Sequence, residues 1–284
     1  MHSENPKIAL GTVQFGLDYG ISNRGGKTSQ DEVSNILDVA FNSGLGILDT
    51  AQAYGDSETV LGATHANRFK IITKINPTNV DKGTAEQFVQ KSLQKLRIEK
   101  LYGMLFHSAS SAIENPRIVF ALREMQEKGI IQKLGFSVYS PHELEQCINQ
   151  YGRPDIVQIP FSHLDQRFEE LARELHQNGV EVHTRSTFLQ GLFFKPLEGL
   201  PEFFGPVVPY LKALKSIFLD EDQMAQALLS FCLSKDFIDY VVLGVNNVKQ
   251  LEENLKATES FSGDLPNPPN NIPENIVLPY LWPK

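Results

Sequence analysis

Four polar residues between positions 49 and 107 have the types and spacing that proton transfer requires. Asp49 ends the apolar run "GILD", Tyr54 follows five residues later, Lys74 lies in "KIITKI", and His107 ends "LYGMLFH". A free tyrosine has a pKa of about 10, but a cation roughly 4 Å away favours the phenolate by on the order of 4 kcal/mol. We therefore expect the charge of Lys74 to lower the pKa of Tyr54 to near 7, and we expect Asp49 to keep Lys74 charged. His107 would hydrogen-bond a substrate oxygen or relay its proton.

Short apolar runs alternate with amphipathic segments along the chain, and this pattern predicts where the four residues lie. The expected strands span 7–13, 46–50, 70–75, 101–107, 130–138, 155–160, 180–185 and 239–245. The expected helices begin at Ser29 or span 57–65, 84–96, 116–128, 141–150, 165–178, 221–234 and 247–258. In the helix from Ser29, Ser29 and Glu32 have the spacing of a capping box. Its predicted apolar face consists of Val33, Ile36, Leu37, Ala40 and Phe41.

Strict alternation indicates a parallel sheet with helical crossovers. Eight units in 284 residues match the count and size of a (β/α)8 TIM barrel. The alternative is a doubly wound open sheet, but no "GxGxxG" follows any of the strands. We predict one barrel domain over residues 1–284. Consecutive strands are neighbours in a barrel, so the four polar residues should converge on one spot.

Two segments depart from the regular alternation. The connection from Thr184 to Asp220 is far longer than usual, which predicts a functional loop after the seventh strand. Residues 262–284 form a tail rich in proline and asparagine that ends with Tyr280, Leu281 and Trp282. These aromatic residues predict docking against the barrel, either as packing or as a pocket wall.

Composition excludes several classes of function. The net charge of −8 without a basic cluster argues against a nucleic-acid surface. No run of 18 apolar residues exists, so no membrane span is expected, and the N-terminus lacks a signal-peptide pattern. Cys147 and Cys232 are expected to be reduced core thiols, which predicts a cytoplasmic protein. No metal site and no particular oligomeric state is predicted.

A proton donor placed at a carbonyl oxygen suits carbonyl reduction. No side chain can deliver hydride, so a bound cofactor must supply it. The segment "VVLGVNNVKQLEENL" provides a place for its phosphates, where the eighth strand turns through Gly244 into a helix. Ser137 and Gln158, in the fifth and sixth strands, would hydrogen-bond an amide such as that of nicotinamide.

At these residues the chain resembles the aldo-keto reductase family. "DTAQAYGDSE" is similar to that family's signature, and "IITKI" and "MLFH" supply its two further positions in the same order. The resemblance implies a (β/α)8 barrel that uses NAD(P)H without a Rossmann domain. It implies that Tyr54 is the general acid, that Lys74 and Asp49 tune it, and that His107 orients a carbonyl substrate.

The same resemblance implies the cofactor contacts. Ser137 and Gln158 match contacts to the nicotinamide amide, and "TRSTFLQGLF" matches the loop near the pyrophosphate. Gln250 and Asn254 match positions that approach the adenine. The full expected set is Thr12, Ser137, Gln158, Arg185, Ser186, Phe188, Gln190, Gly244, Gln250 and Asn254.

Several positions depart from the family pattern. Val138 stands where an asparagine is common, and Arg185 stands where an aromatic residue usually stacks on the nicotinamide. Arg185 would either stack on the ring itself or reach an anionic group of the substrate. Gly244 and Gln250 occupy places where a lysine and an arginine often bind the 2′-phosphate, although the nearby Lys249 and Lys256 would be substitutes. By the family's habit NADP(H) is expected, with NAD(H) as the alternative.

Two other functions fit the same residues. In the first, Lys74 would act as the Schiff-base amine of an aldolase or isomerase. In the second, the barrel would be a non-catalytic subunit that binds NADP(H). The segments "LGTVQFGLDYGISN" and "RSTFLQGL" are similar to reductases linked to bacterial sugar and polysaccharide pathways, which favours a sugar-derived carbonyl.

Overall fold

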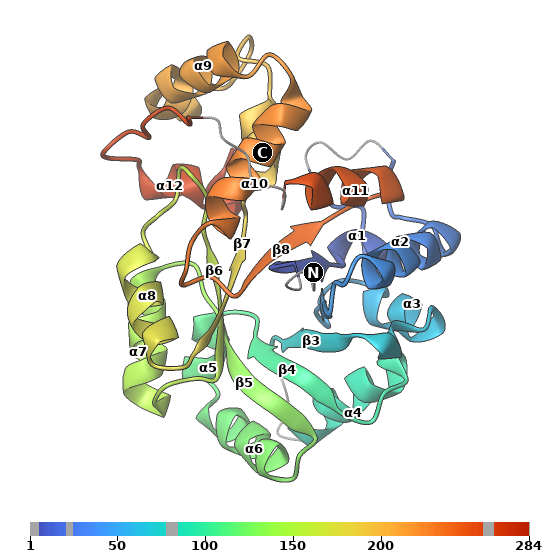
Figure 1. Cartoon of the computed structure of the whole chain (residues 1–284). Helices are drawn as coiled ribbons and strands as arrows, with labels where there is room; N and C mark the ends of the chain where they lie inside the picture. The colour runs from blue at the N-terminus through green and yellow to red at the C-terminus, as the bar shows by residue number, and fades with distance from the viewer. Residues whose placement is uncertain (1–5, 21–24, 78–84, 258–263, 284) are drawn as a thin grey trace.

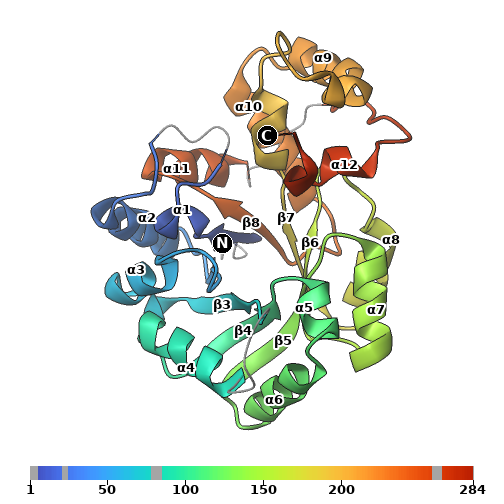
Figure 2. The same ribbon diagram turned by 180° about the vertical axis from the view of Figure 1, so that it is seen from behind.

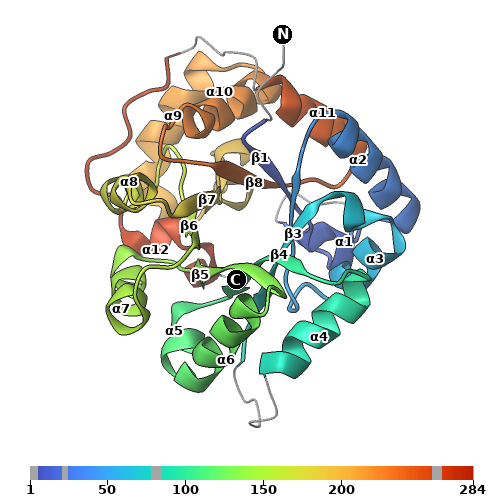
Figure 3. The same ribbon diagram turned by 60° about the horizontal axis from the view of Figure 1, so that its bottom comes forward.

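Eight parallel strands close into a barrel in which each strand pairs with the next in sequence and β8 pairs with β1. The computed structural model describes residues 6–20, 25–77, 85–257 and 264–283. The strands are β1 (Ile8–Gly11), β2 (Ile47–Asp49), β3 (Lys70–Ile75), β4 (Leu101–Phe106), β5 (Ile131–Ser137), β6 (Ile156–Pro160), β7 (Glu181–Arg185) and β8 (Tyr240–Gly244). The predicted (β/α)8 barrel is therefore confirmed, and the open sheet is excluded (Figure 3).

Helices surround the barrel, and the eight predicted ones are present with shifted ends. They are α2 (Gln30–Asn42), α3 (Ser57–Ala63), α4 (Ala85–Leu96), α6 (Pro116–Glu127), α7 (Pro141–Tyr151), α8 (Glu169–Gln177), α10 (Glu221–Leu233) and α11 (Val248–Lys256). The largest shift is in α8, which starts at Glu169 and not at residue 165. Thr84, the expected start of α4, lies outside the described residues. The short α1 (Val13–Gly16) and α5 (Ala109–Ile113) were not predicted. In the described ranges, the helices are too short or too polar to cross a bilayer.

The start of α2 differs from the predicted capping box. The Ser29 side chain accepts a hydrogen bond from the backbone N–H of Glu32, as expected. The Glu32 carboxylate does not return to Ser29 but accepts from the backbone N–H of Val248, which ties α2 to the start of α11. The predicted apolar face is buried except at Phe41, which is 45% exposed beneath the guanidinium of Arg68. Tertiary contacts thus redirect one capping side chain and leave one apolar residue outside.

The connection between β7 and α10, predicted as a functional loop, is a folded segment. It contains two 3-10 segments, η2 (Leu189–Phe194) and η3 (Glu202–Val207), and α9 (Val208–Ile217). These elements pack a separate apolar cluster together with the C-terminal α12 (Glu274–Val277) and with Trp282, which follows η4 (Pro279–Leu281). Figures 1 and 2 show α9, α12 and the C-terminus gathered at the same end of the barrel as α10.

The predicted tail, residues 262–284, docks in both of the ways proposed for it, as far as residues 264–283 are described. The Trp282 ring packs edge-on against Phe204 at 5.0 Å between centroids, and its indole N–H donates to the Ile276 carbonyl at 2.8 Å. Tyr280 contributes to a pocket wall. Residues 262, 263 and 284 lie outside the described part of the chain.

Candidate active site

A buried ion pair lies at the carboxyl end of β2 and β3. Lys74 Nζ donates to Asp49 Oδ1 at 2.5 Å and to the Thr50 carbonyl at 3.0 Å, and Lys74 is only 1% exposed. The second carboxylate oxygen of Asp49 accepts from Gln158 Nε2 at 2.7 Å. Removing two charges from water is costly unless each charge finds partners. Asp49 and Lys74 meet that requirement with each other, with Gln158 and with the Thr50 carbonyl.

Tyr54 and His107 lie directly above this pair. Their rings meet edge-to-face, with centroids 5.7 Å apart, and Lys74 Nζ lies 5.1 Å from the centroid of the Tyr54 ring. Within the part of the chain that the structure describes, the Tyr54 hydroxyl has no hydrogen-bond partner. The four residues predicted to converge do so, and the phenol is left available to a ligand.

Close backbone approach fixes the loop that carries Tyr54. Gly16 at the end of α1 lies so near this loop that an added Cβ would be 1.8 Å from the Tyr54 carbonyl oxygen. Gly55 has a φ of +57°, a conformation that glycine adopts without strain. Ser57 Oγ donates to the Thr12 side chain at 2.9 Å, and Thr12 Oγ1 donates to the Asp49 carbonyl at 3.0 Å. The two glycines and two hydroxyls therefore hold the Asp49–Tyr54 segment against α1.

The pKa of Tyr54 is raised above its usual 10, in contrast to the expectation that Lys74 would bring it near 7. Burial is the largest cause and the Asp49 carboxylate the next, while Arg185 acts in the opposite direction. The expectation was wrong because Asp49 accompanies Lys74 and cancels much of its field, and because burial disfavours the phenolate. Tyr54 is therefore a protonated phenol at neutral pH, which is the form that a proton donor needs.

Burial also governs the pKa values of His107 and Lys74. It lowers the pKa of His107 to about 4, assisted by the positive charges of Lys74 and Arg185 and opposed by Asp49. His107 is thus neutral at pH 7 and carries one N–H donor. Burial lowers the pKa of Lys74, and the bonded Asp49 carboxylate opposes that shift.

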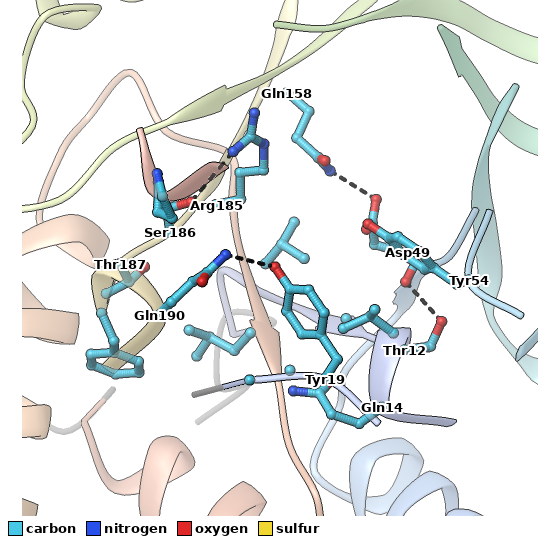
Figure 4. Close-up of a pocket in the computed structure, with 18 of the residues that line it drawn as sticks. Thr12, Gln14, Tyr19, Asp49, Tyr54, Gln158, Arg185, Ser186, Thr187 and Gln190 are labelled. Atoms are coloured by element: carbon cyan, nitrogen blue, oxygen red, sulfur yellow. Dashed lines mark hydrogen bonds between the residues drawn. The ribbon is translucent and has the colours of Figure 1, made fainter. Parts of the chain in front are cut away.

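A cavity of about 440 Å³ opens above these residues at the carboxyl ends of the strands, where barrel enzymes place their active sites. Asp49, Tyr54 and His107 line it, whereas Lys74 lies behind Asp49 and does not. Figure 4 shows the polar side chains that converge on it from β1, β2, β6 and β7. The predicted cofactor residues on its wall are Thr12, Ser137, Gln158, Arg185, Ser186, Phe188, Gln190 and Gly244.

A second cavity of about 300 Å³ continues the first toward α10 and α11. Gln250 and Asn254, the two remaining cofactor predictions, line it. The walls of both cavities include Gln14, Tyr19, Gly20, Phe188, Phe194 and Gly244. All ten predicted contact residues therefore border one long groove, although their contact with a cofactor remains a prediction.

Several groove residues were not singled out by the sequence. Gln14, Tyr19 and Tyr139 line the first cavity, and each follows an expected strand closely, which is the signal that would have found them. Glu221 and Asp222 line the second cavity from the start of α10. They lie far from any predicted strand end, and no pattern in the sequence marks them.

The guanidinium of Arg185, at the end of β7, packs over the ring of Tyr139. The guanidinium carbon is 4.3 Å from the centroid of the Tyr139 ring, and Nη2 donates to the Val138 carbonyl at 3.0 Å. The guanidinium therefore packs on Tyr139 within the protein, and Arg185 also lines the cavity. Contact of Arg185 with nicotinamide or with an anionic substrate stays a prediction.

The backbone after β7 is strained where it borders the cavity. Ser186, Leu189 and Gln190 have φ values of +68°, +42° and +50°, in the region that non-glycine residues rarely adopt. Gln190 Nε2 donates to the Tyr19 hydroxyl at 3.1 Å, across the groove (Figure 4). Such strain persists only where surrounding contacts enforce it, and it is concentrated at functional sites.

Comparison with known proteins agrees with the residues and the fold. The model of the Aldo/keto reductase family matches residues 7–262. This chain belongs to the aldo-keto reductase family. Its reaction class follows from that membership: it is an NAD(P)H-dependent reductase.

The relatives of this aldo-keto reductase are distant but span most of its length. It is 24% identical to the uncharacterized oxidoreductase YqkF of Bacillus subtilis, over 89% of this chain and 91% of that protein. It is 25% identical to a chloroplastic pyridoxal reductase of Arabidopsis thaliana, over 80% of this chain and 72% of that protein. The holo structure of the aldo-keto reductase AKR11C1 of Bacillus halodurans superposes with a TM-score of 0.70 at 21% identity. That comparison covers 91% and 88% of the two chains and shows the shared fold.

The groove has the features that a dinucleotide requires. It is elongated, and it extends from the Tyr54 side chain to residues of two helices, α10 and α11. Gln14 lies on the wall shared by both cavities, where its Oε1 is buried with no hydrogen-bond partner among the described residues. An orphaned buried amide in such a wall suits a polar ligand. The residues present therefore fit the nicotinamide dinucleotide that the family uses.

Proposed function

We propose that this enzyme reduces an aldehyde or ketone to an alcohol, with Tyr54 as the proton donor. The observation that carries the proposal is the Tyr54 hydroxyl, which has no hydrogen-bond partner among the described residues. It lies at the cavity beside neutral His107 and above the buried Lys74–Asp49 pair. Bound in the groove, a nicotinamide cofactor would supply the hydride that the carbonyl carbon needs. Tyr54 then gives its proton to the carbonyl oxygen, which would otherwise become an alkoxide, a stronger base than phenolate.

Each neighbour of Tyr54 has a distinct role in this proposal. The N–H of His107 would donate to the carbonyl oxygen and orient it toward the phenol. Lys74 would stabilise the phenolate that forms when Tyr54 loses its proton, at the 5.1 Å separation from the ring. Asp49 holds Lys74 in place, and Gln158 holds Asp49. Lys74, Asp49 and Gln158 therefore act as positioning groups beneath the reacting atoms.

The cofactor would lie along the groove. Ser137 and Gln158, which face each other in the β5–β6 register, would hold the nicotinamide amide. Ser186, Phe188 and Gln190 would hold the pyrophosphate, and Gln250 and Asn254 the adenosine. Thr12, Arg185 and Gly244 complete the wall that it would contact.

The aldolase or isomerase alternative is disfavoured by access. Lys74 is 1% exposed and gives two hydrogen bonds to Asp49 and Thr50, so a carbonyl carbon has no path to its amine. The non-catalytic alternative is disfavoured because all four polar groups are in place. We further propose a sugar-derived substrate, since Tyr19, Tyr139 and Tyr280 offer aromatic faces at the cavity.

The whole chain is proposed to work as one domain in the cytoplasm. The described part of the tail packs against the β7–α10 segment, which supports a single unit. Cys147 and Cys232 are both buried free thiols. Such thiols are typical of a reducing compartment.

A carbonyl panel tests this function. Purified enzyme is titrated with NADH and NADPH by fluorescence, and the decrease of absorbance at 340 nm is then followed with sugar aldehydes, ketones and small aldehydes. Turnover of at least one carbonyl, with the alcohol identified as product, is expected. Dinucleotide binding without turnover across the panel would favour the non-catalytic alternative, and borohydride trapping of a substrate on Lys74 would favour the aldolase.

A further inference from the structure

The second cavity, next to α10 and α11, has an acidic wall. Glu221 and Asp222 line it from the first turn of α10, and Glu253 lines it from α11. Among the residues that the structure describes, neither a lysine nor an arginine lines this cavity. The charged side chains that the described residues contribute to this wall are therefore all carboxylates.

The two lysines expected to replace the missing cations do not reach the cavity. Lys249 is directed to the outside, where its Nζ lies 3.3 Å from Glu253 Oε1 and its side chain is 83% exposed. Lys256 is exposed and is not part of the wall. Lys249 thus neutralises part of the Glu253 charge, whereas neither Glu221 nor Asp222 forms an ion pair in the described ranges.

Gly244 has no side chain that could place a cation on this wall, and Gln14 occupies the space beside it. A Cβ at Gly244 would lie 2.5 Å from Gln14 Oε1, so any side chain there would displace Gln14. The Oε1 atom of Gln14 and Oδ1 of Asn246 are buried and have no partner among the described residues. Two amide groups border the cavity at this point, and both line the space that a polar ligand would enter.

We propose that this cavity selects NADH against NADPH, an inference that rests on the proposed reductase function. A 2′-phosphate would add about −1.5 to −2 charge at neutral pH. It would meet the carboxylates of Glu221 and Asp222, and no cation among the described lining residues would compensate their charge. The 2′-hydroxyl of NADH adds no charge and can donate to an amide or carboxylate oxygen. The acidic wall therefore acts as a repulsive element against the phosphorylated cofactor.

Equilibrium binding compares the affinities for NADH and NADPH in the absence of a carbonyl substrate. Titrations of the wild-type enzyme with NADH and NADPH by intrinsic fluorescence and by calorimetry are expected to give a Kd for NADH at least about tenfold lower. The ratio of the two Kd values should approach one as the sodium chloride concentration is raised, because salt screens the repulsion between exposed charges. Equal affinity, or tighter binding of NADPH, would overturn the proposal.

Charge-neutralising variants locate the effect. Glu221→Gln combined with Asp222→Asn is expected to tighten NADPH several-fold while the Kd for NADH stays within twofold. Gln250→Arg, which adds a cation to the wall, should tighten NADPH further. Glu252→Gln is the matched control, because Glu252 lies on α11, is exposed and does not line the cavity. An equal effect of this control would show that net charge, and not the wall, sets the ratio, and would overturn the proposal.

The outcomes also separate this inference from the proposed function. Carbonyl reduction with a preference for NADPH would refute the cofactor selection alone. Binding of NADH with the expected selectivity, but without carbonyl reduction, would leave the selection intact and refute the reductase. Failure of both dinucleotides to bind would overturn both.

Discussion

Two clusters that each combine a carboxylate, a lysine, a tyrosine and a histidine lie at opposite ends of the barrel. The cluster at the carboxyl ends of the strands consists of Asp49, Tyr54, Lys74 and His107. The cluster near the amino ends of the strands consists of Tyr102, Lys133, Glu181 and His183. Each contains a carboxylate, a lysine, a tyrosine and a histidine, so composition alone does not distinguish a site from a structural network.

In the cluster near the amino ends of the strands, the lower cluster, every donor is directed at the carboxylate of Glu181. Glu181 accepts from the Tyr102 hydroxyl at 2.6 Å and from Lys133 Nζ at 2.5 Å, and it lies 2.7 Å from His183 Nε2. Burial acts to raise the pKa of Glu181, but these hydrogen bonds outweigh it and lower the pKa to about 2. The phenol is used internally, and this cluster borders neither cavity of the groove.

In the cluster at the carboxyl ends of the strands, the upper cluster, the carboxylate of Asp49 accepts from other donors than the tyrosine. Lys74 and Gln158 occupy the two oxygens of Asp49, and the Tyr54 hydroxyl is left facing the cavity. A tyrosine is therefore available for chemistry when other donors already occupy the hydrogen-bonding oxygens of its neighbouring carboxylate.

The largest expected effect comes from removing the two phenols in turn. Tyr54→Phe should lower kcat by about 10²–10⁴, the usual contribution of a general acid, and leave the cofactor Kd nearly unchanged. Tyr102→Phe is the matched change at the other cluster. It should retain kcat within a few-fold and lower the free energy of unfolding by about 1 kcal/mol, since Glu181 keeps two other partners. Comparable losses of kcat in both variants would contradict the contrast.

The lysines should differ mainly in stability. Lys74→Met leaves the buried Asp49 charge without its cation, which typically costs about 3–5 kcal/mol of unfolding free energy. Lys133→Met should cost only about 1 kcal/mol, because the Lys133 side chain is 26% exposed and Glu181 keeps Tyr102 and His183. Urea denaturation measures both. Adding Asp49→Asn to Lys74→Met should restore part of the loss, and no restoration would argue against a charge effect.

The smallest effect is on the pH dependence of stability, and the clusters should act in separate windows. The pKa of His107 is lowered from 6.5 to about 4, so the unfolded chain binds a proton that the folded enzyme does not. Stability should therefore fall as pH drops from 6.5 to 4, by at most about 1.4 kcal/mol per pH unit. The pKa of Glu181 is lowered from 4.5 to about 2, so this residue contributes stability above pH 4.5 that is lost as pH falls toward 2.

Two variants should remove these slopes separately. His107→Gln should flatten the dependence between pH 6.5 and 4 in part, since the pKa of His163 is also lowered to about 4, by burial and by Lys235. Glu181→Gln should flatten only the more acidic window. Urea midpoints measured from pH 7.5 to 3 give both slopes, and a change in the wrong window would show that another group titrates there.

The sequence predicted the upper cluster because its members end consecutive strands. The order Asp49, Lys74, His107 follows β2, β3 and β4, and the closing of the barrel makes neighbours of strands that are neighbours in sequence. The lower cluster was not predicted. Its members lie near the starts of β4, β5 and β7, and mutual contact of such residues depends on side-chain direction across the barrel. The folded β7–α10 segment was missed for a similar reason, because its apolar residues pack on the distant tail.

The sequence by itself determined the alternating elements, the barrel and the residues that ring its carboxyl end, because these follow from local periodicity and from chain order. Only the tertiary structure decided which groups pair across the barrel. It placed Gln158 on Asp49, 109 positions away, and raised the pKa of Tyr54 where the sequence suggested a lowered one. It also brought Glu221 and Asp222 to the second cavity. Burial and long-range charge depend on three-dimensional distance, which residue spacing along the chain does not specify.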